Sequence, residues 1–338
     1  MKVKKAFITG ISGMVGSHLA EYLVKNTNWN IDGMIRWRSS LQNLNNIVPL
    51  ANDRNRVNFI YADLKDSYSI DEAIKKSKPD YIFHLAAQSF PQASFNSPLD
   101  TFDTNIHGTE RILSAIKKFS PNSIIHICSS SEVFGKVPKN KIPIDENCTF
   151  HPASPYAISK VGTDLLSKFY FEAYGLKTLT TRMFTHTGPR RGDMFAESTF
   201  AKQIAMIEKD IIKPIIKVGN LESLRTIADV RDAVKAYYLL VTKNPIPGEI
   251  YNIGGEYSCK IKDILDFLIG ISTKKNIRYE IDSGRLRPID ADLQIPNTKK
   301  FQSHTGWKPE YKFEETMTDL LNYWRQQIDI NPHLFLTR

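Results

Sequence analysis

A chain of 338 residues that is 41% hydrophobic and 24% charged can bury a substantial core and has the ordinary composition of a globular protein. Its formal charge of +9 comes from lysines and arginines spread along the chain, which argues against a nucleic-acid partner but leaves a small anionic ligand compatible. No apolar run approaches the length of a membrane span, so no membrane partner is expected. The apolar stretch before Gly10 is too short for a signal peptide, and three scattered cysteines favour the cytoplasm, without disulfides or a metal site.

The chain opens with the pattern of a strand, a tight turn and a helix. Residues 3–9 are mostly apolar, GISGMVG follows directly, and an amphipathic helix pattern comes next. Glycines in this spacing allow a sharp turn and a close approach of the backbone to a pyrophosphate, which the helix N-terminus attracts. Three glycines also serve ordinary turns, but this place in the chain predicts a dinucleotide site. The expected cofactor contacts here are Gly10, Gly13, Met14, Val15 and Gly16.

The second predicted strand, residues 31–35, bears on which cofactor binds. An acidic residue at its end would bind the ribose 2′-hydroxyl of NAD, but the chain continues with RWRSS. Arg36, Arg38 and Ser39 offer hydrogen-bond donors that suit a 2′-phosphate. We therefore expect NADP, while NAD stays open, as does an interpretation of both arginines as exposed loop residues.

Strand and helix patterns then alternate, with strands at residues 57–61, 81–84 and 124–127 and helices near 69–76 and 101–119. This alternation predicts an α/β fold with a doubly wound parallel sheet of the Rossmann type. Ligands of such sheets bind at the carboxyl ends of the strands, so the residues that follow each strand should lie along one edge. The cofactor contacts expected there are Asp63, Leu64, Leu85, Ala86, Ala87 and Gln88.

Residues 128–160 carry the expected active site. An apolar run ends in SSSEVFG, which puts hydroxyls and a carboxylate at a strand tip, and SPYAISK follows after a loop. Tyr156 and Lys160 are four residues apart in a segment without helix breakers, so a helix would present both on one face. Tyr61 and Lys65 have the same spacing, but they fall where a strand ends. A phenol beside an ammonium and a hydroxyl-rich strand tip suits proton transfer.

The second half of the chain is less regular. Its patterns predict a helix to about residue 174, a strand at 178–184, a helix at 196–209, a strand at 215–218, a helix opened by GNLESLRTIADVRDAV, a strand at 250–253 and a helix at 313–327. Arg, Asp and Pro are frequent between these short elements, which suits a smaller C-terminal lobe. We expect residues 1–185, with a returning segment of about 225–255, to form the dinucleotide-binding domain. Residues 186–224 and 256–328 would form an α/β substrate lobe.

Several motifs, in this order and spacing, point to a known family. GISGMVG, HLAAQS, SSSEVFG and SPYAISK resemble the extended short-chain dehydrogenase/reductase family over nearly the whole chain. Within it, GPRRGDMF, GNLESLR, RPIDAD and GWKP resemble the GDP-mannose 4,6-dehydratase group, including its relatives that act on GDP-N-acetylglucosamine and GDP-heptoses. The group shares the predicted fold and dinucleotide site, so the resemblance agrees with the patterns above.

The resemblance implies a role for each residue of the expected active site. Tyr156 would take the proton from the sugar 4-hydroxyl, Lys160 would lower the pKa of the phenol and hold the nicotinamide ribose, and Ser130 would bind the 4-oxygen. Glu132 would remove the C5 proton and help water leave from C6. Many dehydratases of the wider family carry Asp-Glu here, whereas this chain has Ser131 and Glu132, as in the GDP-mannose group. The alternative that Glu132 is a surface carboxylate after a strand, without a catalytic role, stays open.

The substrate contacts lie mainly in the second lobe. Loop arginines suit bidentate contacts to a diphosphate, although each is also compatible with a structural ion pair. By resemblance, Arg225 is the strongest phosphate candidate, and Arg191 is compatible with the cofactor site of a neighbouring subunit. Asp290 replaces a usual glutamate and Thr187–Gly188 replaces a Glu-Ser pair, so the hexose is left open. The expected substrate contacts are Ser89, Ser131, Glu132, Arg190, Arg191, Lys202, Gly219, Arg225, Arg287 and Asp290.

The sequence therefore predicts an NADP-dependent GDP-sugar 4,6-dehydratase that supplies deoxysugars for surface glycans and works without a metal. A nucleotide-sugar 4-ketoreductase or 4-epimerase is the alternative, and a non-catalytic NADP-binding regulator is a more distant one. His84 and His186 are interpreted as structural, because the mechanism needs no histidine. By analogy with relatives, a homodimer or homotetramer would form through two long helices at residues 101–119 and 154–174.

Overall fold

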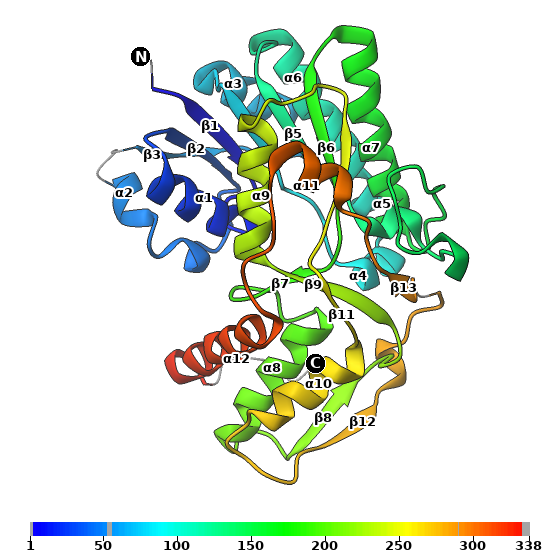
Figure 1. The fold of residues 1–338 in the computed structure, drawn as a ribbon. Helices are drawn as coiled ribbons and strands as arrows, with labels where there is room; N and C mark the ends of the chain where they lie inside the picture. The colour runs from blue at the N-terminus through cyan, green and yellow to red at the C-terminus, as the bar shows by residue number, and fades with distance from the viewer. Residues whose placement is uncertain (1–2, 53–55, 290, 333–338) are drawn as a thin grey trace.

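The computed structural model describes residues 3–52, 56–289 and 291–332 (Figure 1). Its main sheet has seven strands, all paired in parallel, in the order β10-β6-β5-β4-β1-β2-β3. The doubly wound sheet predicted from the strand and helix alternation is confirmed. The strands are β1 (Lys5–Thr9), β2 (Asn30–Ile35), β3 (Val57–Tyr61), β4 (Tyr81–His84), β5 (Ile124–Cys128), β6 (Lys177–Met183) and β10 (Ile250–Ile253).

Helices cover both faces of this sheet, as Figure 1 shows. Apolar side chains between the sheet and each helical layer form two of the hydrophobic clusters of the core. Such double coverage explains why β1 and β4 read as almost continuous apolar runs. One layer contains α1 (Met14–Asn26), α2 (Val48–Asn52), α9 (Val230–Thr242) and α11 (Lys299–Thr305), and the other contains α3 (Ser67–Ser77), α6 (Gly108–Phe119) and α7 (Pro155–Tyr174).

The helix predicted at residues 101–119 is not one regular α-helix. The structure has α5 (Pro98–Phe102), a π-helical turn at Asp103–His107 and then α6, while α4 (Pro91–Asn96) precedes them. The spacing of apolar residues in this region predicted one helix and did not indicate the turn. A π turn inserts one residue into the hydrogen-bond ladder and is frequent at functional sites.

The second lobe is built around two small sheets. The first pairs β9 with β7, β11 and β13, and the second pairs β8 with β12. Helices α8, α10 and α12 pack together over a separate apolar cluster. The elements are β7 (His186–Thr187), α8 (Ala196–Glu208), β8 (Ile215–Val218), β9 (Leu224–Asp229), β11 (Tyr257–Lys260), α10 (Ile261–Gly270), β12 (Arg278–Ile281), β13 (Leu293–Gln294) and α12 (Phe313–Ile330).

The sequence prediction was wrong about the segment that opens α9. It assigned the whole of GNLESLRTIADVRDAV to the start of a helix, but residues 224–229 form β9, and the helix begins only at Val230. Asp229 separates the two elements, because its carboxylate caps α9 by accepting a hydrogen bond from the Arg231 N–H. The strands β11, β12 and β13 and the helices α10 and α11 were not predicted.

The chain passes between the lobes several times. Within the expected returning segment 225–255, β9 belongs to the second lobe's sheet, whereas α9 and β10 join the main sheet. The later helix α11 packs on β10, with Phe301 in the core of the first lobe. The division into domains therefore stays a prediction, and the shared strands and helices join the lobes closely. Among the described residues, no helix is long and apolar enough to cross a membrane, and no cluster of three metal-binding side chains occurs.

Candidate active site

A cavity of about 1230 Å³ lies along the carboxyl ends of the main strands and continues into the second lobe. Almost all of the predicted site residues line it, although they come from segments spread over 278 positions of the sequence, from Gly10 to Arg287. Arg38 does not line it, and Asp290 lies outside the described residues. The predicted residues along the cavity are Gly10, Gly13, Met14, Val15, Gly16, Arg36, Ser39, Asp63, Leu64, Leu85, Ala86, Ala87, Gln88, Ser89, Ser130, Ser131, Glu132, Tyr156, Lys160, Arg190, Arg191, Lys202, Gly219, Arg225 and Arg287.

The glycine turn between β1 and α1 has the geometry of a phosphate cradle. Gly10 adopts φ +70°, and a Cβ there would lie 2.9 Å from the Ala86 Cα, so only glycine fits. A Cβ on Gly16 would lie 2.3 Å from the Gly10 carbonyl oxygen, which explains how α1 packs so closely onto the turn. No side chain caps the N-terminus of α1, and its first turn carries no acidic residue. Free N–H groups at a helix N-terminus suit an anionic pyrophosphate.

The end of β2 lacks a carboxylate that faces the cavity. Arg36 and Ser39 line the cavity, whereas Asp32, within the strand, is buried and accepts a hydrogen bond of 2.6 Å from the Ser77 hydroxyl. This part of the cavity therefore suits a 2′-phosphate better than a free ribose diol. Arg38 instead places its guanidinium over the exposed ring of Trp37, 4.6 Å from the ring centroid, so its assignment to the 2′-phosphate stays a prediction.

The strand tip after β5 presents the hydroxyl and carboxylate groups together. Residues Ser131–Phe134 form a 3-10 turn, anchored by Val133 and Phe134 in an apolar cluster. The Ser130 hydroxyl accepts a hydrogen bond from the Glu132 N–H at 3.2 Å. The Glu132 carboxylate makes no hydrogen bond or ion pair within the described part of the chain, and its charge acts on Tyr156. An acid or base for a substrate is therefore available beside Ser130.

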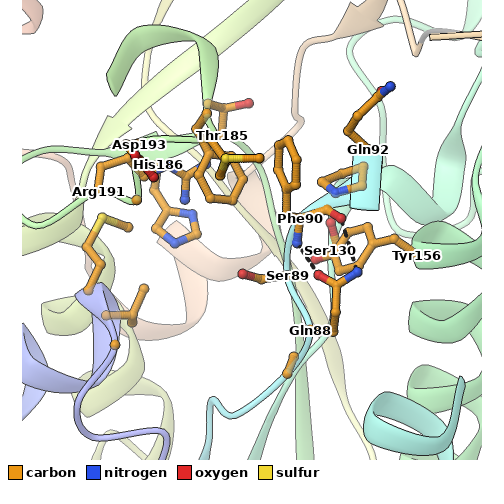
Figure 2. A pocket seen from close by; sticks show the side chains of 18 of the residues that line it. Gln88, Ser89, Phe90, Gln92, Ser130, Tyr156, Thr185, His186, Arg191 and Asp193 are labelled. Atoms are coloured by element: carbon orange, nitrogen blue, oxygen red, sulfur yellow. Dashed lines mark hydrogen bonds between the residues drawn. The ribbon is translucent and has the colours of Figure 1, made fainter. Parts of the chain in front are cut away.

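Tyr156 and Lys160 are both buried on α7, as the helix prediction required. Figure 2 shows Ser130 next to the Tyr156 ring, with Ser89 and Phe90 nearby and with His186 and Arg191 facing them across the cavity. Burial raises the pKa of the Tyr156 phenol, and the nearby Glu132 charge adds to this effect, while a hydrogen bond with Ser130 and the charge of Arg191 lower it. The Lys160 ammonium donates to the Cys128 carbonyl at 2.7 Å. Its Nζ atom lies 6.0 Å from the centre of the Tyr156 ring.

A buried polar network supports the turn after β4. Thr9 Oγ1 accepts from the Leu85 and Ala86 N–H groups at 3.0 Å each, so its own proton points to His84 Nδ1 at 2.9 Å. The proton of His84 then lies on Nε2, 3.0 Å from the Thr109 hydroxyl, and burial lowers the pKa of His84 to about 3. His84 is neutral and structural, as the sequence analysis expected.

The loop GPRRGDMF uses its arginines within the chain. The Arg190 guanidinium donates to the Ser17 hydroxyl at 3.1 Å and to the Glu21 carboxylate at 2.6 Å, both on α1. Arg191 donates to buried Glu197 at 3.1 Å and lies 3.4 Å from the centre of the Phe195 ring. Structural ion pairs therefore engage both side chains, and substrate contacts by either stay predictions.

The other predicted cations also have partners inside the protein. Lys202 pairs with Asp193 at 2.8 Å, and the buried Arg225 donates to the Ala291 carbonyl oxygen. Two cavity residues with unsatisfied buried atoms were missed by the sequence analysis, Gln92 through its Oε1 and Arg285 through its Nη2. No motif marks them, because Gln92 follows a turn and Arg285 stands among many loop arginines. Phe90 and Phe195, which meet edge to face at 5.5 Å, were missed as well.

The parallel sheet, the glycine turn and the Ser130, Tyr156 and Lys160 arrangement define a dehydrogenase/reductase of the short-chain type. A sequence profile of the family described as GDP-mannose 4,6 dehydratase matches residues 7–320. The chain therefore belongs to the GDP-mannose 4,6-dehydratase family, which confirms the resemblance noted in the sequence.

Individual relatives are similar over most of their length. The chain is 33% identical to GDP-mannose 4,6 dehydratase 2 of Arabidopsis thaliana, over 92% of the chain and 84% of the relative. It is 27% identical to GDP-6-deoxy-D-mannose reductase of Pseudomonas aeruginosa, over 96% of the chain and 98% of the relative. Among solved structures, RMD from Pseudomonas aeruginosa complexed with NADPH superposes with a TM-score of 0.81 at 26% identity, over 96% of the chain and 100% of that structure.

Proposed function

We propose that the protein is an NADP-dependent GDP-sugar 4,6-dehydratase, a hydro-lyase that converts a GDP-hexose or GDP-heptose to its 4-keto-6-deoxy form. The observation that carries the proposal is the Glu132 carboxylate, which lies at the cavity beside Ser130, acts on Tyr156 and is not used by another described side chain. Removal of water requires a base at C5 and an acid at C6, and a carboxylate can serve as both in turn.

The cradle of this chain fits NADP. The glycine turn would hold the pyrophosphate, Arg36 and Ser39 would hold the 2′-phosphate, and the Lys160 ammonium would hold the nicotinamide ribose. When bound, NADP would supply the hydride chemistry of the reaction, as the acceptor for oxidation at sugar C4 and the donor for reduction at C6. The relative solved with NADPH supports this choice, and NAD is the alternative.

The residues of the chain divide the proton transfers between them. Tyr156 takes the proton of the 4-hydroxyl while Ser130 donates a hydrogen bond to the developing 4-keto oxygen. The keto group acidifies the C5 hydrogen, which Glu132 removes. Glu132 then gives that proton to the departing C6 hydroxyl, which leaves as water and creates a double bond between C5 and C6. Reduction of this double bond at C6 would leave a carbanion at C5 that is stabilised by the 4-keto group, and Tyr156 gives its proton to C5. Each residue ends in its starting state.

A 4-ketoreductase is the closest alternative, since a curated reductase is 27% identical to the chain over almost its full length. A reductase or 4-epimerase needs the tyrosine and the lysine but has no step for a carboxylate beside Ser130. Glu132 therefore favours the dehydratase. A non-catalytic NADP-binding regulator is less consistent with the buried Tyr156 and Lys160 set, because a sensor has no use for proton transfer.

Two measurements test this function. Purified protein with NADP is incubated with GDP-, UDP-, CDP- and dTDP-sugars, and mass spectrometry records whether each sugar loses one water molecule. The Glu132→Gln variant should lose dehydration by about 10²- to 10⁴-fold, the range for a positioned acid or base. Glu72→Gln, which removes an exposed carboxylate paired with Lys75, is the matched control. NADPH-dependent reduction of a 4-keto sugar, without water loss from any sugar, would support the reductase instead.

The substrate of the family's named dehydratases is a GDP-sugar, and we propose the same nucleotide for this chain. We further propose that the enzyme works in the cytoplasm as a homodimer or homotetramer, in the synthesis of deoxysugars for surface glycans. The three cysteines of the chain are unpaired, which suits a reducing compartment.

A further inference from the structure

The far end of the cavity contains a guanidinium nitrogen without a partner. Arg285 belongs to the 3-10 turn Ser283–Arg285, directly after β12, and lines the cavity. Its Nη2 atom is buried and has no hydrogen-bond partner among the residues that the structure describes, whereas its Nε donates to the Asp282 carboxylate at 3.2 Å. Buried donors in folded proteins are almost always satisfied, so an orphan donor in a cavity indicates a ligand acceptor.

Asp282 and Arg285 together present a hydrogen-bond acceptor and a hydrogen-bond donor, which suits a nucleobase better than a phosphate. Asp282 also lines the cavity, and its Oδ1 accepts from the Gly284 N–H at 3.0 Å, which fixes the carboxylate. A carboxylate beside the guanidinium cancels its net charge and would repel a diphosphate. The same two side chains present an acceptor and a donor next to one another, which is the pattern that the edge of a nucleobase needs.

Asp282 and Arg285 lie at the end of the cavity far from Tyr156, where the nucleobase of a bound nucleotide sugar would be expected. In β9, Ala228 pairs with His186 near the catalytic end, and Arg225 stands three residues earlier, which corresponds to about 10 Å along a strand. Gly219, at the end of β8, approaches Arg285 so closely that a Cβ would lie 2.9 Å from the Arg285 carbonyl. Figure 1 shows β8 and β12 together at the end of the second lobe that is far from β5.

The parts of a nucleotide sugar fit this order. A sugar at Tyr156 would place the diphosphate toward Arg225 and the base toward Asp282 and Arg285. We propose that Asp282 and Arg285 recognise the base of the substrate; the inference rests on the proposed GDP-sugar function, in which that base is guanine. Guanine carries adjacent N1–H and N2–H₂ donors beside the O6 acceptor. The carboxylate of Asp282 accepts from the donors, and Arg285 donates to O6.

The test uses the full-length protein loaded with NADP and measures the dissociation constants of GDP, IDP, UDP and ADP by calorimetry. The wild type should bind GDP more tightly than the other three. Arg285→Leu should weaken GDP binding by about 10- to 100-fold, the range for one specific base contact, and should change UDP binding little. Arg278→Leu is the matched control, since Arg278 is exposed on β12 and does not line the cavity, and its affinities should equal those of the wild type.

A second variant separates the carboxylate from the guanidinium. IDP lacks the N2 amino group, so Asp282→Asn should shrink the preference of the protein for GDP over IDP while Arg285 still discriminates against UDP. Arg285→Lys keeps the charge but loses the planar fork, and it should retain folding with reduced GDP affinity if the leucine variant does not fold.

Distinct outcomes overturn the inference and the proposed function. Equal weakening of GDP, UDP and ADP by Arg285→Leu would assign Arg285 to the phosphates and overturn base recognition. An unchanged preference for GDP in both variants would also overturn it, with the dehydratase function intact. If the wild type itself prefers another nucleotide, the guanine assignment fails, while the water-loss measurement decides separately whether the protein is a dehydratase.

Discussion

Tyr156 must lose a proton to start the reaction, yet its surroundings in the protein oppose this loss. Burial is the largest cause of its raised pKa, and Cys128 and Glu132 add to it. The charge of Arg191 works in the other direction, although its ion pair with Glu197 at 3.1 Å weakens the effect. The charge of Arg191 therefore favours the phenolate form of Tyr156, while the substrate contact expected from the sequence stays a prediction.

The first prediction concerns this tuning. Arg191→Met should raise the pKa of Tyr156 further, so the acid limb of the kcat/KM profile should move to higher pH, because activity requires the phenolate. Glu197→Gln should move the acid limb to lower pH. It removes the carboxylate that neutralises Arg191, so the Arg191 charge should lower the pKa of Tyr156 more strongly. The profiles of both variants and the wild type are measured between pH 6 and 10. Shifts in the same direction for the two variants would contradict the electrostatic role.

The site residues that belong to short sequence motifs are the ones that the sequence predicts well. Gly10, Ser130, Tyr156 and Lys160 belong to short motifs whose spacing carries the chemistry, and the structure brings them into one cavity. Arg190 behaves differently. Its partner Glu21 lies 169 positions away, so no local pattern distinguishes a ligand-binding arginine from one in an ion pair.

The π turn before α6 connects two parts of the site, the loop after β4 and helix α7. Its Asn105 accepts a hydrogen bond from the Gln88 N–H at 2.8 Å and donates to the Gln88 carbonyl at 2.9 Å. The same side chain donates to Ser159 on α7 at 2.8 Å. Without the residue that the π turn inserts, the helical positions on its two sides would differ in relative orientation by about 100°. The turn therefore fixes the cofactor loop after β4 against the helix that carries Tyr156.

The second prediction follows from these contacts. Asn105→Leu should lower the free energy of unfolding by about 2–4 kcal/mol, because it leaves buried groups of Gln88 and Ser159 without partners. Urea denaturation at pH 7.5 measures the change. Asn26→Leu, which removes an exposed amide at the end of α1, is the control and should alter stability by less than about 0.5 kcal/mol. A similar small change for both variants would show that Asn105 does not hold the site together.

Elements of the first lobe were easier to predict than those of the second. In the first lobe, buried strands alternate with amphipathic helices in a regular order, and the expected bounds agree with the structure to within a few residues. In the second lobe, β12 is exposed along its whole length and β13 has only two residues, so neither leaves an apolar pattern. The strand β9 was missed because it passes directly into α9 without a glycine or proline between them.

The two lobes contact one another along α1. The loop after β7 lies on this helix, where Arg190 adopts φ +69° and reaches Ser17 and Glu21. His18 Nε2 lies 3.1 Å from the Pro189 carbonyl in the same contact. Glu21 also accepts from Asn46 at 3.0 Å, so the contact extends to the segment that follows Arg36 and Ser39. The second lobe and the segment that follows Ser39 thus both contact one helix, α1.

The last prediction concerns the pH dependence of this contact between the lobes. Burial is the main reason that the pKa of His18 is lowered to about 4, and the charge of Arg190 lowers it as well. In the unfolded chain a histidine has a pKa of about 6.5. Between pH 6.5 and 4 the unfolded state therefore binds a proton at His18 that the folded state does not. Protonation of the unfolded state at His18 therefore does not lower the free energy of unfolding above pH 6.5, but it lowers this free energy progressively as the pH falls toward 4.

His18→Gln keeps an amide that can donate to the Pro189 carbonyl but does not titrate. The difference in unfolding free energy between the wild type and this variant should stay constant above pH 7. Between pH 6 and 4.5, the free energy of unfolding of the wild type should fall relative to that of the variant by about 1.4 kcal/mol per pH unit. Urea denaturation at several pH values measures it, and the other buried histidines cancel because both proteins contain them. Parallel pH dependence of the two proteins would contradict a neutral His18 between the lobes.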